Sequence, residues 1–116
     1  MESQLNQKLK ISLYTDDKCF GPGISELLDI IEKTGSLRSA TIEMGMAYSK
    51  AWKILKNCEE KLGFKLLISK AGGRNGGGAM VTDEAKIFNE TYKQYCKELK
   101  NFSNELFCSK FESYLK

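Results

Sequence analysis

The glycine-rich run AGGRNGGG, residues 71–78, is the segment of this sequence best suited to a close approach between backbone and phosphate. A P-loop requires Lys and then Ser or Thr after its last glycine, whereas Ala79 and Met80 follow here. A dinucleotide-binding motif would open a helix, whereas residues 79–82 favour a strand. We therefore expect no nucleotide site. We predict a flexible hairpin tip whose Arg74 reaches a phosphate or a narrow minor groove, and the alternative is a tip that contacts nothing.

Basic and hydroxyl side chains that precede this loop are suited to binding a nucleic acid. Ser49, Lys50 and Lys53 fall in the first turns of a predicted helix, away from its apolar stripe. A lysine can donate to guanine O6 or N7, or contact a phosphate, so we expect at least one of these lysines to touch phosphate. The predicted DNA-binding residues are Ser36, Arg38, Tyr48, Ser49, Lys50, Lys53, Lys70, Arg74 and Asn75.

Three residues of this region have simpler expected roles. Ser36 can equally be a plain N-cap of the helix that follows it. Trp52 is expected to be a packing residue, and Lys56 a solvated charge or a backbone contact.

A catalytic set does not emerge from the sequence. There is no histidine, which is the commonest general base. The adjacent carboxylates at 16–17 and 59–60 are typical of a turn and of a solvated face. The four cysteines form no C-x-x-C pair, so free thiols in a reducing compartment are expected. We therefore expect no enzyme activity, no metal site and no cofactor.

The excess positive charge of the chain lies in its middle third. The whole sequence carries a net charge of +3. Residues 36–74 alone hold eight Lys or Arg and three Glu, while residues 1–35 are net negative and residues 75–116 are neutral. A basic patch confined to one segment is typical of a phosphate-binding surface, and a solvated face without a partner is an equal alternative on charge alone.

Length and composition indicate one globular domain over residues 1–116, with 41% hydrophobic and 28% charged residues. No run of 18 apolar residues occurs, which predicts no membrane span. Residues 1–7 are polar and lack the apolar core of a secretory signal, so we expect a cytoplasmic location.

Three predicted helices would position the basic residues. Apolar side chains at helical spacing predict helices over 24–34, 37–44 and 48–62, each followed by a glycine suited to a helix end. The second and third are joined by a glycine-containing turn, and the third is longer and basic on its outer face. This pattern predicts a helix-turn-helix.

Short β segments flank these helices. Residues 8–14 alternate polar and apolar, which predicts a half-buried strand, with a possible return strand over 18–20. Segments 65–69 and 79–82 predict a hairpin directly after the basic helix. The expected fold class is therefore mainly α with a small β wing: a winged helix-turn-helix, with its core over 21–82 and an N-terminal hairpin.

Residues 83–115 contain neither Gly nor Pro and predict one long helix capped by Thr82. Apolar residues recur from Ala85 to Leu106 at alternating spacings of three and four, which is the seam of a coiled coil. So small a domain cannot bury this seam, so we expect a dimerisation helix that packs against a second copy. Packing onto its own domain is the alternative. The predicted interface residues are Phe88, Tyr92, Tyr95, Leu99, Phe102 and Leu106.

The stretches GPGISELLDIIEKTGSL, GMAYSKAWKIL and AGGRNGGGAMVT resemble the N-terminal DNA-binding domain of the ModE molybdate-responsive transcriptional regulators, which is related to the LysR-type domain. The more specific elements are the Ala51–Trp52 pair and the GG-x-x-GGGA loop. The resemblance implies a winged helix, a homodimer formed by the N-terminal strand region and the final helix, and sequence-specific binding to a palindromic promoter site. It implies a recognition helix at 47–62 and a wing at 65–82.

Three departures from the family pattern affect these expectations. The sequence ends at Lys116, without the oxyanion-binding C-terminal domain of full-length members, so we expect no direct molybdate binding. Ala47 stands where the family more often has Ser, which removes a helix cap of ~1 kcal/mol. Residues 39–41 are less rich in alanine, so their packing is expected to differ slightly.

We interpret the chain as a homodimeric, ModE-like regulator that binds double-stranded DNA. The alternative is a dimeric helical interaction module or adaptor without intrinsic DNA sequence specificity, which uses the hairpin for protein contacts. A small oxyanion- or nucleotide-binding protein is a third hypothesis.

Overall fold

Helices dominate the computed structural model, which describes residues 4–70 and 78–115. Within these residues, the four α-helices are α1 (Pro22–Thr34), α2 (Leu37–Met44), α3 (Tyr48–Leu62) and α4 (Asp83–Lys110). Two antiparallel hairpins pair β1 (Leu13–Tyr14) with β2 (Lys18–Phe20), and β3 (Leu67–Lys70) with β4 (Gly78–Val81). A 3₁₀ turn, η1 (Glu112–Tyr114), follows α4. The predicted class, mainly helical with small β hairpins, is confirmed, and the element order is compatible with a winged helix.

The ends of the first three helices follow from their glycines. Gly35, Gly45 and Gly63 have φ of 76°, 66° and 84°, a left-handed conformation that costs glycine nothing. The predicted bounds of α2 and α3 are confirmed. Helix α1 starts two residues earlier than expected, at Pro22, because the fixed φ of proline suits the first helical position.

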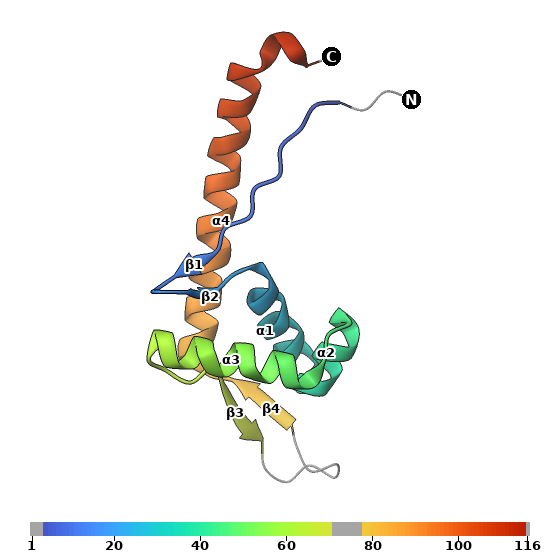
Figure 1. Cartoon of the computed structure of the whole chain (residues 1–116), viewed down its shortest axis with the longest axis vertical. Coiled ribbons are helices and arrows are strands. Elements are labelled where there is room, and N and C mark those ends of the chain that lie inside the picture. The colour runs from blue at the N-terminus through green and yellow to red at the C-terminus, as the bar shows by residue number, and fades with distance from the viewer. Residues whose placement is uncertain (1–3, 71–77, 116) are drawn as a thin grey trace.

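The hydrophobic core surrounds α1. Figure 1 shows α1, α2 and α3 grouped at one end of the molecule, with α4 rising away from them. Side chains from α1, α2, α3, β2, β4, the segment between α3 and β3, and the start of α4 enclose one another. The largest that are fully buried are Phe20, Leu27, Leu28, Ile31, Leu66 and Cys58. The three-helix group is thus a packed unit from which α4 extends.

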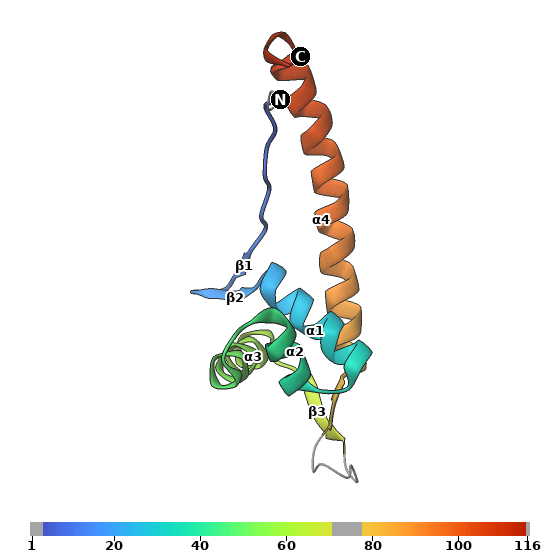
Figure 2. The same ribbon diagram turned by 90° about the vertical axis from the view of Figure 1, so that its right-hand side faces the viewer.

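The N-terminal strand is shorter than predicted. Only residues 13 and 14 of the predicted strand over 8–14 pair, because β2 offers three residues before α1 begins at Pro22. The remainder is extended and lies beside α4, as Figure 2 shows. Gln7 bonds to two α4 side chains there: its Nε2 donates to Asn104 Oδ1 at 3.0 Å, and its Oε1 accepts from Ser103 Oγ at 3.1 Å.

The first half of α4 belongs to the core of its own chain. Phe20 is fully buried, and its ring meets Phe88 and Tyr92 edge-on at centroid distances of 4.8 Å and 5.0 Å. The Tyr92 hydroxyl also donates to the carbonyl oxygen of Ile11 at 2.7 Å. Phe88 and Tyr92, which the seam assigns to a dimer interface, thus pack against Phe20 of their own chain, because the apolar ring of Phe20 needs partners and these two side chains supply them.

A polar network also joins α4 to α1. Ser25 Oγ donates to Asn89 Oδ1 at 2.6 Å, and Asn89 Nδ2 donates to Asp29 Oδ1 at 2.8 Å. Lys93 Nζ reaches the same carboxylate oxygen of Asp29 at 2.9 Å. Asn89 is buried, so a satisfied amide here fixes the rotation of α4 about its axis.

The second half of α4 leaves part of the predicted seam uncovered. Tyr95, Phe102 and Leu106 are 53%, 68% and 49% exposed, and Leu99 is half-buried. The exposed part of the seam is therefore an apolar surface that no other described part of the chain covers.

Among the residues that the structure describes, no helix has both the length and the hydropathy of a membrane span.

We predict that two tyrosines of α4 respond differently to truncation. Tyr92→Ala should lower the free energy of unfolding by about 3–5 kcal/mol, because it removes a buried ring and leaves a cavity. Tyr95→Ala should cost about 0.5 kcal/mol in the monomer, because that ring is half exposed. Urea denaturation at low protein concentration measures both. Equal losses would contradict the assignment of Tyr92 to the core.

Candidate nucleic-acid interface

The buried stripe of α3 determines which of its side chains can meet a partner. Ala51, Leu55 and Cys58 are at most 3% exposed and face the core. Side chains on the opposite face of the helix must then point into solvent. Ser49, Lys50 and Lys53 are all exposed, as their spacing predicts.

Three cations on or beside this face lack acidic partners. Within residues 4–70 and 78–115, neither Lys50 nor Lys53 forms an ion pair, and Arg38 forms none either. Arg38 lies over the ring of Tyr48, with its Cζ 5.6 Å from the ring centroid. These three positive charges therefore remain available for an external anion.

A polar groove of about 310 Å³ runs beside α3, between the start of α2 and the β3–β4 hairpin. Three predicted residues, Ser36, Arg38 and Tyr48, line it together. Trp52, Lys56, Glu59 and residues of the β3–β4 hairpin also line it. We call this concavity the α3 groove.

The predicted site residues divide into separate groups. Ser36, Arg38 and Tyr48 meet in the α3 groove, whereas Lys53 borders a cavity on the other flank of the helix. Ser49 and Lys50 occupy the exposed surface of the first turn of α3. Lys70 is the last residue of β3, opposite Gly78. Arg74 and Asn75 lie outside the residues that the structure describes.

The helix starts at this face are capped differently. The Oγ of Ser36 accepts the backbone N–H of Ser39 at 3.0 Å, which confirms the N-cap alternative for this residue. Ala47 is the N-cap residue of α3 and provides no side-chain cap, as the alanine predicts. The first N–H groups of α3 therefore keep the positive end of the helix dipole directed outward.

Trp52 was expected to pack and is instead 48% exposed. It follows Tyr48 by one helical turn on the same flank of α3, at the edge of the buried stripe. Lys56 Nζ lies 5.3 Å from the Trp52 ring centroid. Trp52 is thus a groove-lining side chain missing from the predicted set, and the i, i+4 spacing from Tyr48 is the sequence signal that could have identified it.

Glu59 was expected on a solvated face, and this expectation is wrong. Its side chain is only 12% exposed. Its Oε2 accepts the backbone N–H groups of Leu66 at 2.8 Å and Leu67 at 3.4 Å, and its Oε1 lies 3.3 Å from Lys56 Nζ. Burial raises its pKa, but these hydrogen bonds outweigh burial and hold the pKa below its usual value. Glu59 therefore ties the end of α3 to the start of the hairpin.

A second bond positions the hairpin at its other strand. The N–H of Ala79 on β4 donates to the carbonyl oxygen of Gly35 at 2.9 Å. Gly35 joins α1 to α2, so β4 is held beside the start of α2. The two attachments fix the walls of the α3 groove.

Among the described residues, no group of three or more Cys, Asp or Glu is placed to hold a metal ion.

Comparison with known proteins finds relatives that carry molybdenum-related names. The chain is 32% identical to the molybdenum transport protein ModE of Herbaspirillum seropedicae over 81 residues, which are 70% of this chain and 28% of that protein. It is 31% identical to the ModE protein of Azotobacter vinelandii over 88 residues, 72% of this chain and 32% of the other. A molybdenum-pterin-binding protein MopB of Rhodobacter capsulatus is 36% identical over 56 residues, 48% of this chain and 21% of that protein.

These matches confirm the resemblance to ModE-type proteins that the sequence motifs indicate. The chain spans about a third or less of the length of these curated relatives. No family model matches the chain.

We predict that Glu59 makes the stability of the protein depend on pH. A carboxylate with a lowered pKa in the folded state stabilises the fold above its unfolded pKa, near 4.5, and this contribution is lost as the pH falls through the folded value. Glu59→Gln should remove part of this acid dependence and cost about 1–2 kcal/mol at pH 7.

The neighbouring Glu60→Gln variant is the control, because Glu60 is exposed. Urea unfolding of both variants is measured from about pH 3 to about pH 7, a range that covers the titration of a carboxyl group. Identical pH profiles for the two variants would show that Glu59 does not hold the hairpin.

Proposed function

We propose that this chain is a sequence-specific, DNA-binding transcriptional regulator of the winged helix-turn-helix type, with α3 as the recognition helix and the β3–β4 hairpin as the wing. The observation that carries the proposal is the outer face of α3, where Ser49, Lys50 and Lys53 are exposed and the two lysines lack acidic partners. A helix that enters the major groove needs such a face, since cations neutralise phosphates while the first turns meet base edges.

The α3 groove, which lies along one flank of α3, supports the same function. Arg38 supplies a cation next to the uncapped start of α3, and both features favour a phosphate. Tyr48 and Trp52 add apolar surface that suits sugar rings or thymine methyl groups. A DNA backbone that follows this groove would leave α3 directed at the bases.

The relatives support a regulatory context related to molybdenum, since their names refer to molybdenum transport and molybdenum–pterin binding. The region shared with this chain is only about a third or less of each relative. Our proposal therefore concerns DNA binding by this chain, and direct molybdate binding is no part of it.

We further propose that the chain acts as a homodimer on a palindromic promoter site, through the exposed part of the α4 seam. Tyr95, Phe102 and Leu106 recur along one side of a helix that extends beyond the three-helix group (Figure 1). A second copy would cover these side chains and place two α3 helices about one DNA turn, ~34 Å, apart.

The same exposed seam supports an alternative, in which α4 binds another protein and the chain is an adaptor without DNA sequence specificity. Gel-shift titration against genomic fragments distinguishes the two. A regulator should select particular fragments, and its affinity should fall steeply as salt rises. Binding that is undetectable, or that salt does not weaken, would contradict the regulator proposal.

We predict that lysines of α3 matter for DNA affinity while a lysine of α4 does not. Lys50→Met and Lys53→Met should each weaken binding, and each should reduce the slope of log affinity against log salt by about 1 if its lysine contacts a phosphate. Lys97→Met is the matched control, because Lys97 is exposed on α4 away from α3. Equal effects of all three substitutions would count against α3 as the recognition helix.

We predict that a charge in the exposed seam yields monomers. Phe102→Asp should dissociate the dimer, because it buries a carboxylate in an apolar interface without a partner. Ile87→Asp is the control: Ile87 lies on the same helix outside the seam, and both side chains are 68% exposed. Sedimentation velocity reads the state of each variant. A dimeric Phe102→Asp protein would place the interface elsewhere.

A further inference from the structure

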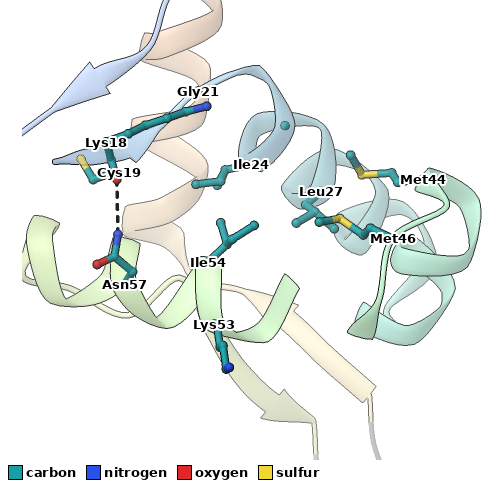
Figure 3. A pocket seen from close by; sticks show the side chains of 11 residues that line it. Lys18, Cys19, Gly21, Ile24, Leu27, Met44, Met46, Lys53, Ile54 and Asn57 are labelled. Atoms are coloured by element: carbon teal, nitrogen blue, oxygen red, sulfur yellow. Dashed lines mark hydrogen bonds between the residues drawn. The ribbon is translucent and has the colours of Figure 1, made fainter. Parts of the chain in front are cut away.

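A second concavity lies on the opposite flank of α3 from the α3 groove. Its volume is about 350 Å³, within the range of small-molecule sites. Residues of β2, α1, the α2–α3 turn and α3 enclose it, as Figure 3 shows. We call it the β2–α3 cavity. None of the DNA contacts proposed above needs its interior.

The walls of the β2–α3 cavity are apolar. Ile54 of α3 points toward Ile24 and Leu27 of α1 (Figure 3). Met44 and Met46 close one side with flexible thioether side chains that adapt to a ligand. These walls suit a hydrocarbon chain or a ring.

The rim of the cavity is positive. Lys18 and Lys53 are its charged lining residues, and no carboxylate lines it. Within the described chain, neither lysine forms an ion pair. In Figure 3 Lys18 lies across Gly21 at one rim, and Lys53 lies at the opposite rim with its ammonium directed outward.

Gly21 allows this position of Lys18. A Cβ at residue 21 would lie 3.2 Å from Lys18 Cε and 3.7 Å from Nζ, so a side chain there would crowd the end of the lysine. Gly21 is also the N-cap of α1 and has no side chain to accept the first N–H groups of that helix. Both features keep the mouth of the cavity beside Lys18 favourable for an anion.

From these walls and this rim, we propose that the β2–α3 cavity binds a small apolar monocarboxylate, with its hydrocarbon part among Ile24, Ile54 and the two methionines and its carboxylate beside Lys18. An apolar ligand without charge would leave the unpaired ammonium at the mouth unused. A polyanion would gain little from walls of this kind.

Occupancy of the cavity has a consequence for α3. Lys53, Ile54 and Asn57 form its wall on that helix, and the Asn57 Nδ2 donates to the carbonyl oxygen of Lys18 at 3.3 Å, which joins α3 to β2. A ligand between these elements would shift or stiffen α3 and so change DNA affinity. This consequence rests on the proposed function, whereas binding of the carboxylate does not.

Methyl NMR of methionine tests the binding directly, without DNA. Protein with ¹³C-labelled methionine methyl groups is titrated with octanoate at millimolar concentrations. The Met44 and Met46 signals should shift saturably, and the Met80 signal, from β4, should stay in place. No saturable shift, or an equal shift at Met80, would overturn the proposal.

Two variants and one analogue define the binding mode. Ile54→Phe should weaken the shifts, because the larger ring takes up part of the cavity beside Ile24. Lys18→Gln should weaken octanoate binding about threefold, while the control Lys65→Gln, exposed and away from the cavity, should not. Octan-1-ol should bind more weakly than octanoate. Equal binding of the alcohol, or no effect of Lys18→Gln, would overturn the carboxylate assignment.

Octanoate should then also change DNA affinity in a gel shift. Loss of this effect with intact methionine shifts would contradict only the regulatory consequence. Methionine shifts in a protein that binds no DNA would leave the site standing and remove the proposed function.

Discussion

The narrow buried stripe of α3 is the constraint on which the rest of the structure depends. Ala51, Leu55 and Cys58 are almost completely buried, so the rotation of the helix about its axis is determined. The cations of its outer face must then face solvent, and its flanks border a polar groove on one side and an apolar cavity on the other. Burial also raises the pKa of the Cys58 thiol to about 12, so this cysteine acts as a neutral core residue. The burial of this one stripe thus sets the environments of the other α3 side chains.

The β3–β4 hairpin packs Leu67, Ala79 and Val81 against the core, and polar contacts at both of its strands help to position it. Glu59 accepts two backbone N–H groups where the chain leaves α3, and Gly35 accepts the N–H of Ala79 on the returning strand. Hydrogen bonds to a carboxylate are stronger than neutral ones, and they are directional. A short two-stranded hairpin that is only marginally stable alone is held in this way against the three-helix group. The geometry of the α3 groove therefore depends on Glu59, which is also one of the residues that line it.

Helix α4 packs into the core with its first turns and carries an exposed apolar surface on its later turns. Its first turns complete the core through Phe88 and Tyr92, and the Ser25–Asn89–Asp29 network fixes its rotation. Its later turns carry the exposed aromatic side chains. Because an α-helix is stiff over this length, a partner that binds the far end would orient the three-helix group at the near end. The orientation of α3 relative to a second copy would then follow from the interior of each chain.

The sequence by itself determined the helices, their glycine ends, the N-caps at Ser36 and Thr82, and the exposure of the α3 cations. These are local properties, since they depend on spacing along the chain and on the conformational freedom of single residues. The same spacing placed Phe88, Tyr92, Tyr95 and Phe102 in one seam, and periodicity alone does not reveal where a domain ends along a helix. Only the tertiary structure decided that the rings of Phe88 and Tyr92 pack against Phe20. It also decided that Glu59 accepts backbone N–H groups seven and eight residues away, and that Trp52 lines a groove. Each of these depends on elements brought together by folding, and the energy of such contacts is set by distances in space that the order of residues does not specify.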